Sequence, residues 1–168
     1  MVVILVGCDC TGKSTCVDSM DKSIGKFCKG SANVDLTMAI MNLESDLIKQ
    51  GLVIHDRIPL IDDIVYSQVF SHRPSKLMNR VIEISELLEK CIVIYFDCDN
   101  EEIARRMRER GDHYVEESQI PEIKEEYEKT FEILGVNPIR IDTTHKTPGV
   151  VYDEVMEVIR KNEELQNS

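Results

Sequence analysis

Hydrophobic residues recur along the chain in two alternating patterns, which predict strands and helices in turn. Continuous apolar runs such as Met1–Val6 and Cys91–Phe96 are typical of strands that are buried on both faces of a sheet. Between such runs, apolar residues return at helical spacing, as they do across Asp35–Lys49. The expected strands are Met1–Val6, Phe27–Lys29, Leu52–His55, Cys91–Phe96 and Pro138–Ile141. The expected helices are Ser14–Ile24, Asp35–Lys49, Ile61–Phe70, Lys76–Glu89, Glu101–Arg110, Ile120–Leu134 and Gly149–Lys161.

The order of these elements indicates the fold class. Strands that alternate with helices favour an α/β fold, in which a five-stranded parallel sheet carries helices on both faces. The 168 residues, of which 42% are hydrophobic, suit a single globular domain that spans 1–168. Ligands of such sheets bind at the carboxyl ends of the strands, so the residues that follow a strand are the first candidates for function.

The segment after the first predicted strand carries the strongest chemical signal in the chain. Gly7-Cys8-Asp9-Cys10-Thr11-Gly12-Lys13-Ser14 fits the whole pattern G-x-x-x-x-G-K-[ST], and a predicted helix follows it. Glycines permit the backbone angles that turn the loop amides toward a phosphate at a helix N-terminus. We expect Lys13 to reach the β- and γ-phosphates of ATP and the Ser14 hydroxyl to ligate magnesium. The predicted ATP site covers this loop and Thr15, which follows it.

Two charged residues, Asp56 and Arg57, come directly after the predicted strand Leu52–His55. We expect Arg57 to bind an acceptor phosphate through its planar guanidinium, and Asp56 to order the water ligands of magnesium or to act as a base. The competing interpretation is a structural ion pair between the two. Asp9 is a candidate to hold a sugar hydroxyl of the second substrate, against the alternative of a solvated loop aspartate. The side chains expected beside the acceptor base are Tyr66, Phe70 and Arg73.

The largest basic cluster of this acidic protein lies on the predicted helix Glu101–Arg110. Arg106 and Arg110 are four residues apart and share one helix face. A polar stretch follows, so we expect a lid over about 106–119 that closes on bound phosphates, with both arginines meeting the charge of the transferring group. The alternative is an exposed basic helix that pairs with nearby glutamates. Thr143 and Thr144 follow the last predicted strand and are expected to flank adenine, and Arg106 is also expected to contact ATP.

Charge and cysteine content exclude several other classes of protein. The net charge of −11 opposes stable binding to nucleic acids or to anionic membranes. The longest apolar run, Met1–Val6, is too short to span a membrane and lacks the features of a secretory signal, so we expect a cytoplasmic protein. The six cysteines are expected to be reduced. The spacing of cysteine and histidine does not predict a structural metal site.

The chain resembles the P-loop nucleoside and nucleotide kinases, and most closely the thymidylate kinase-like enzymes. The resemblance covers most of the chain in order. It rests on Gly7-x-Asp9-x-Thr11-Gly12-Lys13-Ser14-Thr15, Asp56-Arg57, Arg106-x-x-x-Arg110-Gly111 and Asp142-Thr143-Thr144. Some members of that family carry a catalytic arginine at the position of Cys10, and its absence here implies that the lid arginines do that work. A compact, cysteine-bearing form of this kind is similar to enzymes encoded by large bacteriophages.

The resemblance implies a P-loop kinase fold with a short lid and a definite activity. We expect a magnesium-dependent transfer of the γ-phosphoryl group from ATP to a deoxynucleoside monophosphate, with a dTMP-like acceptor favoured. Lys13, Arg57, Arg106 and Arg110 are then the catalytic candidates. One alternative is a deoxynucleoside kinase that acts on a 5′-hydroxyl, and a second is a regulator that binds nucleotide without transfer. A homodimer is left open.

Overall fold

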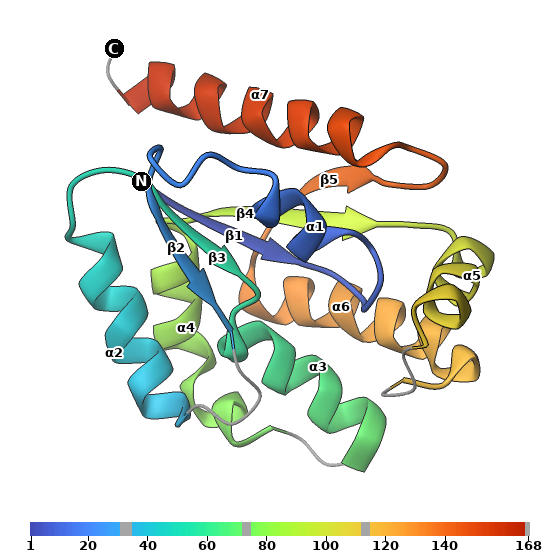
Figure 1. Ribbon diagram of the computed structural model, residues 1–168. Coiled ribbons are helices and arrows are strands. Elements are labelled where there is room, and N and C mark those ends of the chain that lie inside the picture. The colour runs from blue at the N-terminus through green and yellow to red at the C-terminus, as the bar shows by residue number, and fades with distance from the viewer. Residues whose placement is uncertain (31–34, 72–74, 112–114, 167–168) are drawn as a thin grey trace.

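The computed structural model describes residues 1–30, 35–71, 75–111 and 115–166, and within them lies a five-stranded parallel sheet. The strands are β1 (Val2–Val6), β2 (Lys26–Lys29), β3 (Val53–Asp56), β4 (Ile92–Asp97) and β5 (Ile139–Asp142). Their order across the sheet is β2-β3-β1-β4-β5, and each neighbouring pair is parallel. Figure 1 shows this sheet between two layers of helices. The predicted α/β fold class is therefore confirmed.

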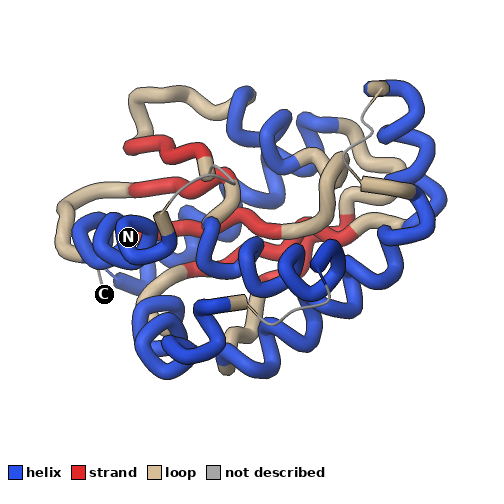
Figure 2. Tube along the Cα trace, turned by 90° about the horizontal axis from the view of Figure 1, so that it is seen from below, coloured by secondary structure: helices blue, strands red, loops and turns tan. Residues whose placement is uncertain are grey.

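The helices divide between the two faces of the sheet. Helices α1 (Lys13–Asp18) and α7 (Pro148–Gln166) pack on one face through apolar residues such as Val17 and Val155. A larger group of helices builds the main core on the other face. Seen from below, this second layer lies along the strands (Figure 2). Its members are α2 (Leu36–Leu47), α3 (Pro59–Ser71), α4 (Val81–Leu88), α5 (Asn100–Arg110) and α6 (Ile120–Leu134).

The central strand determines where the phosphate loop lies. All five residues of β1 are buried, as the apolar run predicts for a strand covered on both faces. In the sheet register, Leu5 of β1 lies beside Asp56 of β3 and Ile94 of β4. The ends of β1, β3 and β4 therefore meet at one edge, which places the phosphate loop next to Asp56 and Arg57.

Two predicted helices differ from the structure because local hydrogen bonds compete with the helix. The helix expected over Ser14–Ile24 ends at Asp18, and the Asp21 carboxylate accepts a hydrogen bond from the Ser23 amide in a turn. The helix expected over Lys76–Glu89 begins instead as a 3₁₀ turn, Lys76–Arg80, whose first residues are capped by the Ser75 hydroxyl.

The predicted lid is described only in part. Helix α5 ends where Gly111 adopts a left-handed conformation with φ of 69°. A short 3₁₀ turn, Glu117–Gln119, leads into α6. Residues 112–114 of the expected lid lie outside the described residues, so its closure stays a prediction. Among the helices described, none combines the length and the apolar character that a membrane span requires.

Candidate active site

The phosphate loop forms a sharp turn between β1 and α1, and its backbone conformation requires glycine at two positions. Gly7 has φ of 139°, and a Cβ there would lie 2.5 Å from the Phe96 carbonyl oxygen, so no other residue fits this approach. Gly12, with φ of 97°, precedes the first turn of α1. The Thr11 hydroxyl closes the loop by donating to the Cys8 carbonyl oxygen at 2.9 Å.

The Lys13 ammonium is buried against the loop, with only 3% of the residue exposed. It donates to the carbonyl oxygens of Gly7 at 2.7 Å and Cys8 at 2.6 Å, and to the Thr11 hydroxyl at 3.1 Å. Burial and the nearby Arg57 guanidinium lower the pKa of Lys13 to about 8. A phosphate anion beside it would stabilise its charged form.

Arg57 leaves the end of β3 with a positive φ of 72°, which is uncommon for a residue with a side chain. Its guanidinium pairs with the Asp9 carboxylate and lies 3.5 Å from an Asp62 carboxylate oxygen. The Tyr66 hydroxyl donates to the other Asp9 oxygen at 3.3 Å. Asp9 is therefore an ion-pair partner of Arg57 rather than a solvated loop residue, and Arg57 pairs with Asp9 and Asp62 instead of with Asp56. The roles of Asp9 and Arg57 toward an acceptor stay predictions.

Asp56 is buried to 96%, and its Oδ1 atom has no hydrogen-bond partner among the described residues. Ser14 lies in the first turn of α1, the helix that follows β1, and β1 pairs with β3, which ends at Asp56. Hydroxyl and carboxylate oxygens are the ligands that Mg²⁺ prefers, directly or through water. The unpaired oxygen of Asp56 and the Ser14 hydroxyl are therefore donor types that suit a magnesium ion, although Asp56 lines neither of the two cavities described below, and the magnesium site stays a prediction.

The two lid arginines differ in what surrounds them. Arg106 donates to the Thr143 carbonyl oxygen at 2.7 Å, to the Cys10 carbonyl oxygen at 3.4 Å and to the Glu102 carboxylate at 2.8 Å. It thereby links α5 to the phosphate loop and to the segment after β5. Arg110, one turn further along α5, lines the cavity over the phosphate loop.

The neighbouring arginines of α5 form surface ion pairs. Arg105 pairs with Glu102 and Glu109, and Arg108 pairs with Glu117. For these two residues the alternative of a basic helix paired with glutamates describes the structure. The Arg105 and Arg106 guanidinium groups also lower the pKa of the Glu102 carboxyl to about 2.

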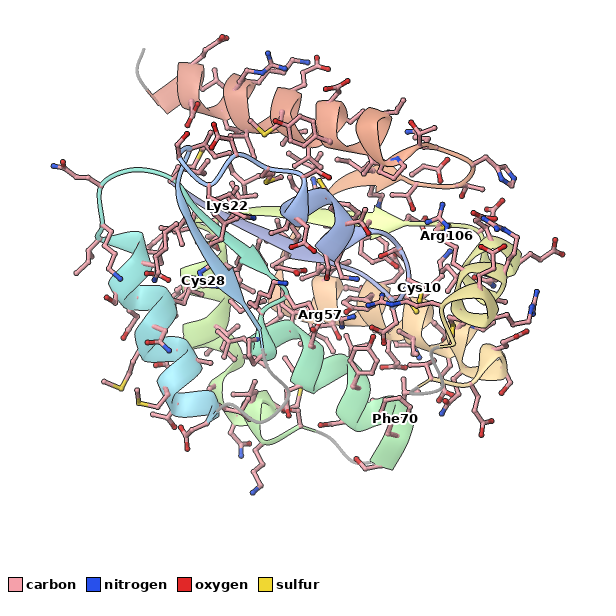
Figure 3. The ribbon with its side chains drawn as sticks, in the orientation of Figure 1. Cys10, Lys22, Cys28, Arg57, Phe70 and Arg106 are labelled. Carbon is pink, nitrogen blue, oxygen red and sulfur yellow. The ribbon has the colours of Figure 1, made fainter. Side chains whose placement is uncertain are left out.

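Two cavities meet at Asp9 and Arg57. The first, of about 550 Å³, lies over the phosphate loop and is lined also by Arg106, Arg110 and Thr143. The second, of about 520 Å³, lies against α3. In Figure 3, Arg57 lies near Cys10 of the phosphate loop, Arg106 lies on α5 and Phe70 lies on α3. The residues that line the second cavity are Asp9, Gly30, Leu36, Arg57, Pro59, Asp62, Asp63, Tyr66, Ser67, Phe70 and Ser71.

Most of the predicted site residues line one of these cavities. Tyr66 and Phe70 stack on each other along the second cavity, with ring centroids 5.6 Å apart. Thr144 does not line the first cavity as described, and its hydroxyl instead accepts from the Asp99 amide at 2.9 Å. Arg73, predicted beside the acceptor base, lies outside the described residues. The predicted ATP-site residues that line the first cavity are Asp9, Cys10, Thr11, Gly12, Lys13, Ser14, Thr15, Arg106 and Thr143.

Sequence reasoning did not identify Asp62, Asp63 and Tyr127. Asp62 and Tyr66 are four residues apart on the predicted helix, so their shared face was a usable signal. Tyr127 comes from α6, and its hydroxyl donates to Asp62 at 2.7 Å, with the Gly7 carbonyl oxygen 3.2 Å away. No pattern within α6 indicates this contact.

Comparison with known proteins gives one curated relative and several structural neighbours. No family model matches the sequence. The SPbeta prophage-derived uncharacterized protein YorR of Bacillus subtilis is 30% identical over 149 residues, which cover 84% of this chain and 88% of YorR. The crystal structure of YorR in complex with phosphorylated GDP aligns over 98% of both chains with a TM-score of 0.76 and 22% identity.

Two further solved structures have the same architecture. Deoxyadenosine kinase from M. mycoides with bound dCTP has a TM-score of 0.62 and 19% identity, over 96% of this chain and 100% of that one. Thymidylate kinase from Candida albicans has a TM-score of 0.61 and 15% identity, over 96% of this chain and 92% of that one. The fold is therefore that of the P-loop kinases, as the sequence predicted.

Proposed function

We propose that this chain transfers the γ-phosphoryl group of ATP to a nucleoside monophosphate and forms the diphosphate. The chain belongs to the family of the prophage-derived YorR protein of Bacillus subtilis. The observation that carries the proposal is the meeting of two cavities at Asp9 and Arg57. The first cavity contains the phosphate loop that holds a donor. The second offers a guanidinium at its inner end and stacked aromatic rings further out.

The donor is held by Lys13 and by the loop amides over the N-terminus of α1. Ser14 would ligate magnesium and Asp56 would order its waters, and the ion when bound neutralises charge on the phosphate oxygens. Arg106 fixes the segment that contains Thr143 against the phosphate loop, so it acts as a positioning residue for the donor side. Arg106 then contributes less to neutralising the transferring group than the sequence pattern predicts.

Arg57 would orient the acceptor phosphate toward the donor, with Asp9 and Tyr66 holding the guanidinium in place. Arg110 would neutralise charge on the transferring group. Positioning and electrostatics of this kind supply most of the rate in phosphoryl transfer, because little covalent chemistry falls to the protein.

Two kinds of acceptor base, thymine and guanine, are candidates for the second cavity. The sequence resemblance favours a dTMP-like deoxynucleotide. YorR, however, was crystallised with phosphorylated GDP, so guanine nucleotides belong in the same test. The Asp62 and Asp63 carboxylates of the second cavity are acceptors that suit either sugar hydroxyls or the N–H groups of a base.

A second candidate function is phosphorylation of a deoxynucleoside at its 5′-hydroxyl. Its support is the pairing of Arg57 with Asp9 and its approach to Asp62, which offsets the positive charge that a monophosphate needs. The likeness in fold to deoxyadenosine kinase is consistent with it.

The decisive experiment is a screen of ADP release from ATP and Mg²⁺ with nucleosides, nucleoside monophosphates and a DNA duplex as acceptors. We expect turnover with a monophosphate and none with its nucleoside or with the duplex. Lys13→Ala is the control for contaminating kinases, and Arg57→Ala should raise the KM of the monophosphate more than that of ATP. Turnover with nucleosides alone would support the second candidate. Nucleotide binding without turnover would leave the protein a regulator and end the proposal.

A further inference from the structure

Cys28, Asp46 and His55 meet on the sheet face that α2 covers, among residues that the phosphoryl-transfer site does not use. Cys28 on β2 and His55 on β3 are paired neighbours in the parallel register. Asp46 reaches them from the last turn of α2. One ligand atom from each side chain lies within 4.8 Å of the other two. Figure 3 shows Cys28 on β2, on the side of α2.

The distances between these atoms suit a single metal ion. The Asp46 Oδ2 atom is 3.2 Å from His55 Nε2 and 3.9 Å from Cys28 Sγ. Zinc bonds of about 2.0–2.3 Å in a tetrahedral site place their ligand atoms about 3.3–3.8 Å apart. Small side-chain adjustments therefore bring all three atoms into a zinc coordination sphere.

The Asp46 carboxylate is already oriented for this role. Its Oδ1 atom accepts hydrogen bonds from Lys26 at 2.8 Å and from Lys49 at 2.7 Å. These contacts turn the other oxygen, Oδ2, toward His55 and Cys28. Both lysine side chains are about half exposed, so their charge is solvated while they hold the carboxylate.

The histidine gives a second and independent indication. His55 is 92% buried, and its Nε2 atom lies 3.2 Å from Asp46 Oδ2 but is not oriented for a hydrogen bond to that oxygen, so it has no hydrogen-bond partner among the described residues. Buried polar side-chain atoms are ordinarily paired, and each exception needs a physical account. A metal ion between His55, Asp46 and Cys28 would supply the missing partner for Nε2.

We propose that Cys28, Asp46 and His55 form a binding site for a zinc-like divalent cation. A thiolate, an imidazole and a carboxylate are the mixed ligand set that Zn²⁺ takes, and half-buried Cys28 leaves a fourth position for water. Coordination replaces the proton of the Cys28 thiol, which is released to solvent.

Occupation of the site would join β2 and α2 to β3. The next two residues of the chain after His55 are Asp56 and Arg57, so the ion would stiffen the strand that presents them. The site is separate from phosphoryl transfer, and the proposal does not depend on the activity.

The test is titration of the metal-free protein with Co²⁺ in excess Mg²⁺, read by absorption. We expect one equivalent to give the charge-transfer band of a cobalt–thiolate bond, and added Zn²⁺ to remove it. Cys28→Ser should abolish the band, and Cys91→Ser, a change at another half-buried cysteine, should leave it intact. His55→Asn should weaken Zn²⁺ binding by more than about tenfold in competition with a chromophoric chelator.

Zn²⁺ should also raise the melting temperature of the wild-type protein and of Cys91→Ser, but not of Cys28→Ser. This second measurement keeps the proposal testable if His55→Asn does not fold. Absence of the charge-transfer band in the wild-type protein would overturn the proposal. So would an unchanged band or an equal rise in melting temperature in Cys28→Ser, because the ion would then sit at other ligands.

Discussion

Lys13 shows how burial prepares one residue for an anion. Its pKa of about 8 lies below the ordinary value because burial and the nearby Arg57 guanidinium disfavour the charge. A bound polyphosphate stabilises the charged form, so the pKa is higher in the complex than in the free protein. At about pH 8.5 the free protein is partly deprotonated at Lys13, and nucleotide binding takes up a proton.

Calorimetry of ATP binding without Mg²⁺, in two buffers that differ in ionisation enthalpy, measures this proton directly. We expect different apparent heats for the wild-type protein at about pH 8.5, where the γ-phosphate of ATP is already ionised, and no proton uptake by Lys13 at about pH 6.5, where only the γ-phosphate of ATP titrates. Lys13→Arg is the matched control, because arginine keeps its charge throughout this range. Equal heats in both buffers at the higher pH would contradict the assignment of Lys13.

Arg106 and Arg110 provide a second prediction at the scale of single residues. Arg106 holds the Thr143 and Cys10 carbonyl oxygens, so Arg106→Ala should mainly raise the KM for ATP. Arg110 lines the first cavity, and Arg110→Ala should lower kcat by about 10²-fold. Steady-state kinetics for both substrates separate the two roles. A change in the acceptor KM alone for Arg110→Ala would be incompatible with charge neutralisation.

At the scale of elements, Tyr127 joins three parts of the site. Its hydroxyl, on α6, donates to Asp62 on α3 at 2.7 Å and lies 3.2 Å from the Gly7 carbonyl oxygen of the phosphate loop. Tyr127→Phe leaves the Asp62 oxygen without this donor. We expect the free energy of unfolding to fall by about 1–3 kcal/mol, measured by urea denaturation.

The matched control is Tyr152→Phe on α7. The Tyr152 hydroxyl makes no hydrogen bond in the part of the chain that the structure describes. Its loss should change stability by less than about 0.5 kcal/mol. Equal stability of the wild-type protein and Tyr127→Phe would mean that the hydroxyl does not hold α6 to the site.

The sequence predicted best those elements whose conformation is determined by their own residues. Met1–Val6 is apolar throughout and forms β1, and the glycines of the phosphate loop have the turn geometry that their positions imply. Helix α1 is shorter than the hydrophobic spacing predicts, because the turn that begins at Asp21 competes with the helix. Such competition depends on side-chain hydrogen bonds that hydrophobic spacing does not record.

Contacts between elements were less accessible to prediction. Asp62 and Tyr127 meet because α3 packs against α6, and neither helix alone contains a sign of its partner. Cys28 and His55 become neighbours only through the register of β2 on β3. Spacing along the chain therefore did not single out the cluster of Cys28, Asp46 and His55. Residues brought together by packing need the fold before their chemistry can be recognised.

At the scale of the whole molecule, charge is unevenly distributed. The chain carries a net charge of −11, yet Lys13, Arg57, Arg106 and Arg110 all line the first cavity. An acidic exterior disfavours duplex DNA, whereas a basic cavity attracts a small polyphosphate. This distribution favours a nucleotide-sized anion as the ligand.

The two cavities share Asp9 and Arg57, so one compound should be able to fill both. Adenosine joined to thymidine through an oligophosphate bridge places one nucleoside in each cavity. Because the second contact is then intramolecular, we expect a Kd at least about 10²-fold below that of ATP, measured by calorimetry. Because Arg57 lines both cavities, Arg57→Ala should weaken binding of the linked compound by a larger factor than it weakens binding of ATP. The guanosine analogue tests the base in the same way. If neither linked compound binds more tightly than ATP, the cavities do not hold donor and acceptor at the distance that direct transfer requires.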